Sequence, residues 1–377
     1  MNMINFSNEK LVVTKSILAQ APTMSIVGIL HALTDTQEFV HHLLSLGHEV
    51  PVIFAKPFSK NTDVIASIER MGVRVEQLDY DTMENTSILH ETIARQLEKA
   101  SLPLALVDVG GYFAKPLSEL STRGTKLPIG VLEVTTFGHN RYLQTMTGIN
   151  VPIISIARSE IKDVEATFVG ESAWFAVDSM LRDVGISAFG KKVGIVGYGM
   201  IGRRVATAAR ANGTHTIVFD KNPLRLLEAR SYRHNVCLSL EELLNACDIV
   251  ISATGTQAIN IADMQDARDG IILASAGSKA NELDMPGVRN RAKRVSHISK
   301  MITEYELPSG KNVHILRNGA AVNFLVGSCP DETMDLVFAE MAEGCKRLVE
   351  NNLEHHVIHE VKDTIRQRIA AEWLALQ

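Results

Sequence analysis

The segment VGIVGYGMIGRRVATAARANGTHTIVFDKNP, residues 193–223, constrains the fold more than any other part of the chain. Residues 193–196 form an apolar run without polar alternation, which predicts a strand buried on both faces. A glycine-rich turn follows, then residues at helical spacing from 203 to 212, and a second apolar run at 216–219. The segment therefore predicts a βαβ unit with a glycine turn at its first strand end.

The turn has the spacing G-x-G-x-x-G, in which glycine lets the backbone approach a pyrophosphate at the positive end of the following helix. Asp220 ends the second strand, where a carboxylate accepts both ribose hydroxyls of an adenosine and repels a 2′-phosphate. The alternative is a glycine-rich turn in another kind of α/β sheet. The combination favours NAD as cofactor, bound by Gly197, Gly199, Met200, Ile201, Gly202 and Asp220.

Composition narrows the class of protein. A chain of 377 residues with 46% hydrophobic and 21% charged residues is typical of a globular protein with two domains. The net charge of −5 argues against a nucleic-acid partner, and no apolar run reaches the roughly 18 residues of a membrane span. Four cysteines without C-x-x-C spacing and an N-terminus without an apolar signal core lead us to expect a cytoplasmic protein with reduced thiols.

Strand and helix patterns alternate along the chain, which predicts an α/β fold with two doubly wound Rossmann-like domains joined by a hinge, and helices at the C-terminus. We expect a substrate domain at 1–185 and a cofactor domain at 186–329. Residues 330–377 pack back on the first domain or mediate oligomerisation. Helices are expected at 170–184, where two domains join, and at 332–351 and 355–376.

Polar residues follow several predicted strands, where loops of this architecture face ligands. His31, Asp108 and Glu133 lie at such ends, and Lys162 follows another. Each has a second interpretation: a hydrogen-bonded core histidine for His31, a turn cap for Asp108 and a solvated helix residue for Lys162. The other residues at strand ends are Thr135, Thr136, Thr254, Gly255, Gly277 and Asn323. The cluster His355, His356, His359 and Glu360 lies on an expected polar helix without a matching acid or cysteine cluster, so we predict no metal site.

From about residue 24 to about 352 the chain resembles S-adenosylhomocysteine hydrolase. The matching stretches, in order, are IVGILHALTDTQEFVHHLLSLGHEV, LVDVGGYF, GVLEVTTFGHNRY, VPIISIARSEIKD, GYGMIG, ISATGT and NGAAVNF. The resemblance implies two α/β domains about a hinge, tightly held NAD, a small-molecule substrate and a homodimer or homotetramer. In that family NAD oxidises a nucleoside 3′-hydroxyl, the C4′ proton becomes acidic, the 5′ substituent leaves, water adds and the ketone is reduced again.

The resemblance also implies residue roles. Lys162 aligns with the lysine that acts at the oxidised hydroxyl, and His31 with a histidine at the 5′ end. Asn323 aligns with an asparagine at the nicotinamide, and Thr135 and Thr136 with threonines that contact the cofactor. Asp108 and Glu133 are expected as catalytic partners of Lys162 and His31.

The chain departs from the family pattern at several substrate-binding positions. The family has an acidic pair before Gly-Gly and a Glu-Glu pair before its threonines, and the second acid of each pair is Val109 or Val134 here. Ala166 and Thr167 replace an Asp-Asn after the lysine, and Ser278 replaces a histidine. Gly327-Ser328-Cys329-Pro330 stands in place of Gly-His-Pro, and the family's C-terminal Lys/Tyr tail has no counterpart.

These features favour a diverged family member that uses bound NAD for oxidation with elimination or epimerisation, followed by reduction, on another hydroxylated substrate such as a modified nucleoside or a sugar. Three alternatives stay open: an authentic S-adenosylhomocysteine hydrolase, a non-catalytic NAD-binding regulator, and a net dehydrogenase of the 2-hydroxy-acid type. Lys162 and Asn323 favour an enzyme over a regulator.

Overall fold

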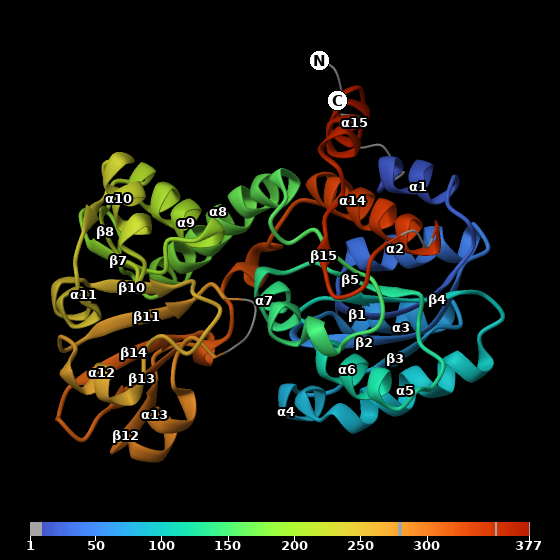
Figure 1. Cartoon of the computed structure of the whole chain (residues 1–377). Helices are drawn as coiled ribbons and strands as arrows, with labels where there is room; N and C mark the ends of the chain where they lie inside the picture. Colours follow the sequence, from blue (N-terminus) through green and yellow to red (C-terminus); the bar gives the residue numbers. More distant parts are fainter. Residues whose placement is uncertain (1–9, 278–280, 351–352, 377) are drawn as a thin grey trace. The chain divides into compact units, whose positions relative to one another are not determined.

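The computed structural model describes residues 10–277, 281–350 and 353–376. The chain divides into two compact units: Met1–Glu165 with Pro330–Gln377, and Ala166–Cys329 (Figure 1). This boundary differs from the one expected at residue 185, because most of helix α8 (Glu160–Arg182) packs its apolar side into the core of the second unit. The C-terminal helices lie in the first unit.

The first unit contains a seven-stranded sheet in the order β15-β6-β5-β4-β1-β2-β3, and all its strand pairs are parallel. The strands are β1 (Ser25–Ala32), β2 (Glu49–Lys60), β3 (Arg74–Glu76), β4 (Leu104–Asp108), β5 (Gly130–Glu133), β6 (Ile153–Ser155) and β15 (Ile358–His359). The strand order reverses between β1 and β4. In open α/β sheets, ligands bind outside the carboxyl ends of the strands at such a point.

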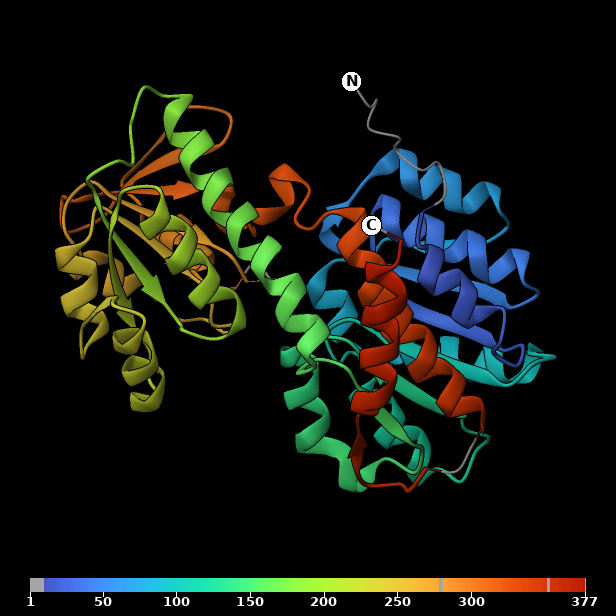
Figure 2. The same ribbon diagram turned by 90° about the horizontal axis from the view of Figure 1, so that it is seen from above.

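Helices cover both faces of this sheet, because alternate strand residues are apolar on both sides. One face is covered by α1 (Val12–Leu18), α2 (Thr34–Ser45), α3 (Thr62–Arg70) and α14 (Asp331–Glu350). The other is covered by α4 (Tyr80–Glu84), α5 (Thr86–Lys99), α6 (Ala114–Thr122) and α7 (Thr136–Thr145), the last followed by the short helix η1 (Met146–Gly148). Helix α15 (Asp363–Leu374) lies along α14, as Figure 2 shows.

The second unit contains an eight-stranded sheet in the order β12-β13-β14-β11-β10-β7-β8-β9. Its strands are β7 (Lys192–Val196), β8 (His215–Phe219), β9 (Asn235–Val236), β10 (Ile249–Ser252), β11 (Ile271–Ser275), β12 (Arg294–His297), β13 (Ile302–Glu306) and β14 (Asn312–Leu316). Only the pairs β12–β13 and β13–β14 are antiparallel among the described ladders of this sheet. The strand order reverses between β7 and β10.

Helices also pack on both faces of the second sheet. Helices α8, α9 (Met200–Ala211) and α10 (Pro223–Ser231) contribute to the core on one face. Helices α11 (Leu240–Ala246), α12 (Ile261–Asp266) and α13 (Met285–Arg291) contribute to the core on the other. The short helices η2 (Arg317–Gly319) and η3 (Asn323–Val326) follow β14. The predicted α/β class with two doubly wound sheets is confirmed.

Two predicted helices were wrong in extent. Helix α8 begins at Glu160 rather than at 170, and it continues through Gly170 without interruption. A Cβ at Gly170 would lie 2.4 Å from Cβ of Arg204, so glycine is present for close packing against α9. The helix predicted at 355–376 begins only at Asp363, and the residues before it include the strand β15, which pairs with β6. The histidine cluster at 355–360 is therefore not on a helix.

Candidate functional site

The glycine turn of the second unit has the geometry that its sequence predicts. Gly197 has a φ of +89°, a region that favours glycine. A Cβ at Gly202 would lie 1.8 Å from the carbonyl oxygen of Gly197, so no side chain fits there. Gly199 faces open space, and α9 begins at the next residue. The unpaired N–H groups of the first turn of α9, which contains Met200 and Ile201, are thus open to an anion.

Asp220 is fixed against this turn. One carboxylate oxygen accepts a hydrogen bond from the backbone N–H of Tyr198 at 2.7 Å, and the other accepts one from the N–H of Asn222 at 2.8 Å. The acid therefore lies beside the turn, at the end of β8. Each carboxylate oxygen has a further lone pair with which to accept a ribose hydroxyl.

The side chain of Asn323, in the second unit, has a buried hydrogen-bond acceptor without a donor among the described residues. Its amide Nδ2 donates to Ser328 Oγ at 2.8 Å, while its Oδ1 is buried and has no hydrogen-bond partner among the described residues. A buried unpaired carbonyl oxygen is costly unless a ligand donates to it. The carboxamide N–H₂ of a nicotinamide is a donor of this kind. The glycine turn and Asp220 have the donors and acceptors that suit the pyrophosphate and ribose of NAD, and the unpaired oxygen of Asn323 suits a carboxamide donor.

Thr254 and Gly255 follow β10, beside the glycine turn. A Cβ at Gly197 would lie 2.9 Å from Thr254 Cγ2, so the two loops are in contact. Gly277 follows the neighbouring strand β11 and is buried. Thr254 and Gly255 lie at the carboxyl end of β10, which with β7 flanks the reversal of strand order, and Gly277 lies at the end of the next strand, β11.

In the first unit, Asp108 and Glu133 are fully buried at the carboxyl ends of β4 and β5. Asp108 accepts hydrogen bonds from the N–H groups of Tyr112 and Phe113 and from the Tyr142 hydroxyl, at 2.8–3.1 Å. Glu133 accepts from the N–H groups of Gly110 and Gly111 and from Thr135. Burial raises the pKa of Asp108, and burial together with the neighbouring Asp108 raises that of Glu133 to about 8.

The two threonines also make local contacts. The Thr135 hydroxyl donates to Glu133 Oε1 at 2.7 Å and accepts from the N–H of Gly138, so it caps α7. The Thr136 hydroxyl donates to the carbonyl oxygen of Ala157 at 3.4 Å. These bonds hold the strand ends and α7 together.

His31 lies near the end of β1, where its Nδ1 hydrogen-bonds to Ser59 Oγ. Burial, and secondarily the charges of Lys56 and Lys162, holds its pKa well below the usual value. Lys56 on β2 is only 2% exposed, and its ammonium lies 5.7 Å from the centre of the Tyr112 ring. Sequence reasoning missed Lys56, because a single lysine in a strand carries no motif.

Lys162 lies in the first turn of α8 and forms an ion pair with Glu165. Its backbone N–H donates to Ser159 Oγ at 3.1 Å. The Ser159 hydroxyl in turn donates to Glu340, which also accepts from Arg366 Nε at 2.7 Å. The C-terminal helix α15 is thereby connected to the start of α8. His31 and Lys162 are both in the first unit, close enough for their charges to interact.

The residues that replace family acids are apolar and enclosed. Val109 is 6% exposed and Val134 is 5% exposed, and both belong to the apolar core of the first unit. Ala166 is buried as well. Ser278 lies outside the described residues. The carboxyl edge of the first sheet therefore has buried acids that hold loops, two lysines, a histidine and two valines.

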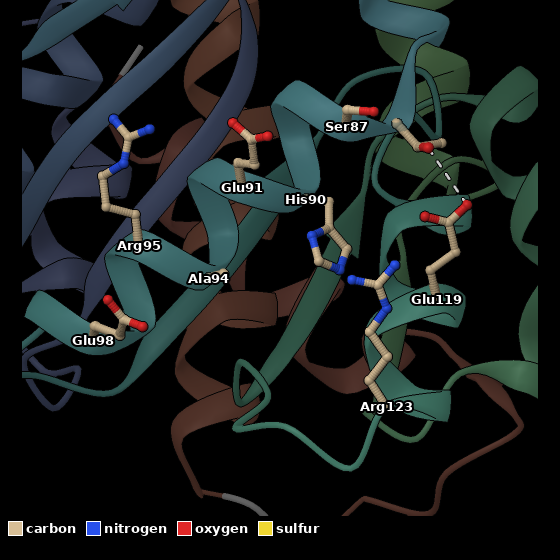
Figure 3. Close-up of a pocket in the computed structure, with 9 residues that line it drawn as sticks. Ser87, His90, Glu91, Ala94, Arg95, Glu98, Glu119 and Arg123 are labelled. Atoms are coloured by element: carbon tan, nitrogen blue, oxygen red, sulfur yellow. Dashed lines mark hydrogen bonds between the residues drawn. The ribbon is translucent and has the colours of Figure 1, made fainter.

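Other features do not add to this site. Figure 3 shows a surface depression between α5 and α6, which both basic and acidic side chains line, among them His90, Arg95, Arg123, Glu91 and Glu119. None of the predicted site residues lines it. Within the described ranges, no cluster of three or more His, Cys, Asp or Glu is suited to hold a metal ion. In the same part of the chain, no helix is both long and apolar enough to span a bilayer.

The fold and the glycine turn define an NAD-binding α/β protein. The fold resembles that of a solved D-3-phosphoglycerate dehydrogenase oxidoreductase from Ralstonia solanacearum, with a TM-score of 0.52, 14% identity, and coverage of 91% of this chain and 98% of that one. Residues 172–329 match the family model of the S-adenosyl-L-homocysteine hydrolase NAD binding domain.

Curated relatives that match most of this chain identify its family. The adenosylhomocysteinase of Saccharolobus solfataricus is 31% identical over 87% of this chain and 78% of its own length. The S-inosyl-L-homocysteine hydrolase of Methanopyrus kandleri is 29% identical over 90% of this chain and 80% of its own length. The chain belongs to the adenosylhomocysteinase family, and its cofactor is NAD.

Proposed function

We propose that this protein uses NAD to oxidise a hydroxyl group of its substrate transiently, and that the substrate is a modified nucleoside or a sugar other than S-adenosylhomocysteine. The observation that carries the proposal is the pair Val109 and Val134, which are buried in the apolar core where the family pattern has acids. Loss of each ionic hydrogen bond to a substrate hydroxyl costs about 1.5–3 kcal/mol. The turn that binds NAD keeps all its glycines.

In this proposal the first unit binds the substrate and the second binds NAD. Bound NAD supplies a hydride acceptor for a secondary alcohol and returns the hydride at the end of the cycle. Lys162 takes the proton of the hydroxyl that is oxidised. His31 is neutral near pH 7 because its pKa is lowered, so it can accept a proton at a neighbouring position of the substrate.

Asp108 and Glu133 have a different role in the proposal from the catalytic one expected at first. Their oxygens accept bonds from backbone N–H groups and hydroxyls of the surrounding loop. They are positioning residues, which hold the loop at 109–113 at the carboxyl edge of the sheet.

We also propose that the protein is a homodimer or homotetramer. Light scattering after size-exclusion chromatography tests this proposal.

Hydrolysis of S-adenosylhomocysteine is the second candidate function, and the adenosylhomocysteinase relatives at about 30% identity favour it. Relatives named S-inosyl-L-homocysteine hydrolase belong to the same group of similar proteins, so the named substrates already differ within it. If this candidate is correct, contacts other than those at 109 and 134 bind the ribose hydroxyls.

The test is release of homocysteine from S-adenosylhomocysteine by NAD-loaded protein, measured with a thiol reagent. In parallel, a panel of nucleosides and polyols is tested for reduction of bound NAD by absorbance at 340 nm. We expect no homocysteine release and NAD reduction by a compound of the panel, with Lys162→Ala as the inactive control. Robust homocysteine release would replace this proposal with the second candidate, and no NAD reduction by any compound would count against the proposal.

A further inference from the structure

Glu282 is a buried carboxylate in the second unit that no prediction included. Its side chain is inaccessible to solvent, although it lies in a loop after β11. It accepts four hydrogen bonds: from the Ser252 hydroxyl at 2.5 Å, from the Thr254 hydroxyl at 2.7 Å, and from the N–H groups of Thr254 and Gly255 at 2.8 and 2.6 Å. All four donors belong to the end of β10 and the loop after it.

The carboxylate of Glu282 also lies against Gly277, which follows the end of β11. A Cβ at Gly277 would lie 2.3 Å from Glu282 Oε1, so any other residue there would displace the carboxylate. Gly277 was predicted to contact the cofactor. The contact with Glu282 gives a separate reason for glycine at this position.

The loop that Glu282 holds packs directly on the glycine turn. A Cβ at Gly197 would lie 2.9 Å from both Ala253 O and Thr254 Cγ2. The strands β7 and β10 that carry these loops are neighbours in the sheet, with Val196 opposite Ser252. A shift of the loop by a few tenths of an ångström would therefore reach the turn that receives the pyrophosphate.

We propose that Glu282 is a positioning residue for NAD: its carboxylate fixes the Thr254–Gly255 loop against the glycine turn and so preorganises the cofactor site without touching the cofactor. The inference rests on the assignment of Thr254 and Gly255 to that site. Glutamine at 282 has the same shape, but its amide has only one acceptor oxygen and adds an N–H₂ group among four donors. The loop then loses bonds and its position is no longer fixed.

The experiment compares wild type, Glu282→Gln and the exposed control Glu241→Gln on α11 of the same unit. NAD affinity is measured by calorimetry after removal of bound nucleotide, and melting temperatures are recorded with and without saturating NAD. We expect Glu282→Gln to bind NAD about tenfold more weakly or worse, with a smaller NAD-induced rise in melting temperature. Glu241→Gln should match wild type.

Two results would overturn the inference. One is NAD affinity of Glu282→Gln within twofold of wild type; the other is an equal loss of melting temperature with and without NAD, which indicates a structural role alone. If Glu282→Gln does not fold, Ser252→Ala removes one donor to the carboxylate, and unchanged NAD affinity in that variant would contradict the inference. Failure of wild type to bind NAD would instead contradict the proposed function.

Discussion

Asp108 and Glu133 are opposite each other in register on the parallel strands β4 and β5, and their carboxylates hold the same loop. Asp108 bonds to the N–H groups at 112 and 113, and Glu133 bonds to those at 110 and 111. Four successive backbone N–H groups are therefore bound by two buried acids. This arrangement gives a structural reason for acids at 108 and 133.

The first prediction concerns this loop. Glu133→Ala leaves the donors of Gly110, Gly111 and Thr135 without their acceptor in a buried place, so the free energy of unfolding should fall by about 3 kcal/mol. Urea unfolding, monitored by circular dichroism, measures this change in the free energy of unfolding. The control is Glu98→Ala, an exposed position on α5, which should change stability by less than about 0.5 kcal/mol. Equal stability of the two variants would contradict the structural role.

Lys162 is the subject of the second prediction. Lys162→Ala should lower turnover at least about 100-fold, because the proton of the oxidised hydroxyl then has no acceptor. NAD binding should be unchanged, since the glycine turn lies in the other unit. Steady-state kinetics on the compound that reduces NAD, together with calorimetry for NAD, separates the two effects. Lys115→Ala on α6 is the exposed control, and near-normal turnover of Lys162→Ala would refute the assignment.

The third prediction concerns cofactor choice. The wild-type protein should bind NAD far more tightly than NADP, because Asp220 repels a 2′-phosphate. Asp220→Asn removes the charge and keeps an acceptor for the Tyr198 N–H, so it should lower the preference without disrupting the turn. Asp220→Ala also removes that acceptor and should weaken binding of both dinucleotides. Dissociation constants for NAD and NADP are the measurement, and equal affinities in wild type would disprove the role of Asp220.

Much of the fold was predictable, because buried parallel strands are continuous apolar runs between glycines and helices. The βαβ unit at 192–219 and the strands at 104–108 and 130–133 are examples. The start of α8 was not, since Gly170 is a packing residue in the helix rather than its beginning. The helix expected from 355 failed because polar residues at helical spacing also occur in a loop and an edge strand.

The local geometry of the candidate site was predictable where a motif carries it, as in the glycine turn with Asp220 at the end of β8. It was not predictable where the role depends on three-dimensional contacts. Lys56 and Glu282 have no motif, and their burial becomes visible only in the folded chain. Asp108 and Glu133 were found at strand ends, but the sequence does not show that their oxygens face backbone donors.

The last prediction concerns the pH dependence of stability and His31. Its pKa in the folded protein lies well below the ordinary 6.5, chiefly through burial and then through Lys56 and Lys162. Below pH 6.5 the unfolded chain therefore binds a proton that the folded protein does not. The stability associated with neutral His31 is present above that pH and is lost as the pH falls, by at most about 1.4 kcal/mol per pH unit.

His31→Asn keeps a polar atom near the position of Nδ1, which faces Ser59, but does not titrate. Urea unfolding at pH 7.5, 6.5 and 5.5 should show a smaller loss of stability on the acid side for this variant than for wild type. Burial also lowers the pKa of His48 and His139 in the same unit, but both are present in each protein and cancel in the comparison. If the two proteins lose the same stability between pH 6.5 and 5.5, His31 is not held neutral in the folded state, and its role as a proton acceptor fails with it.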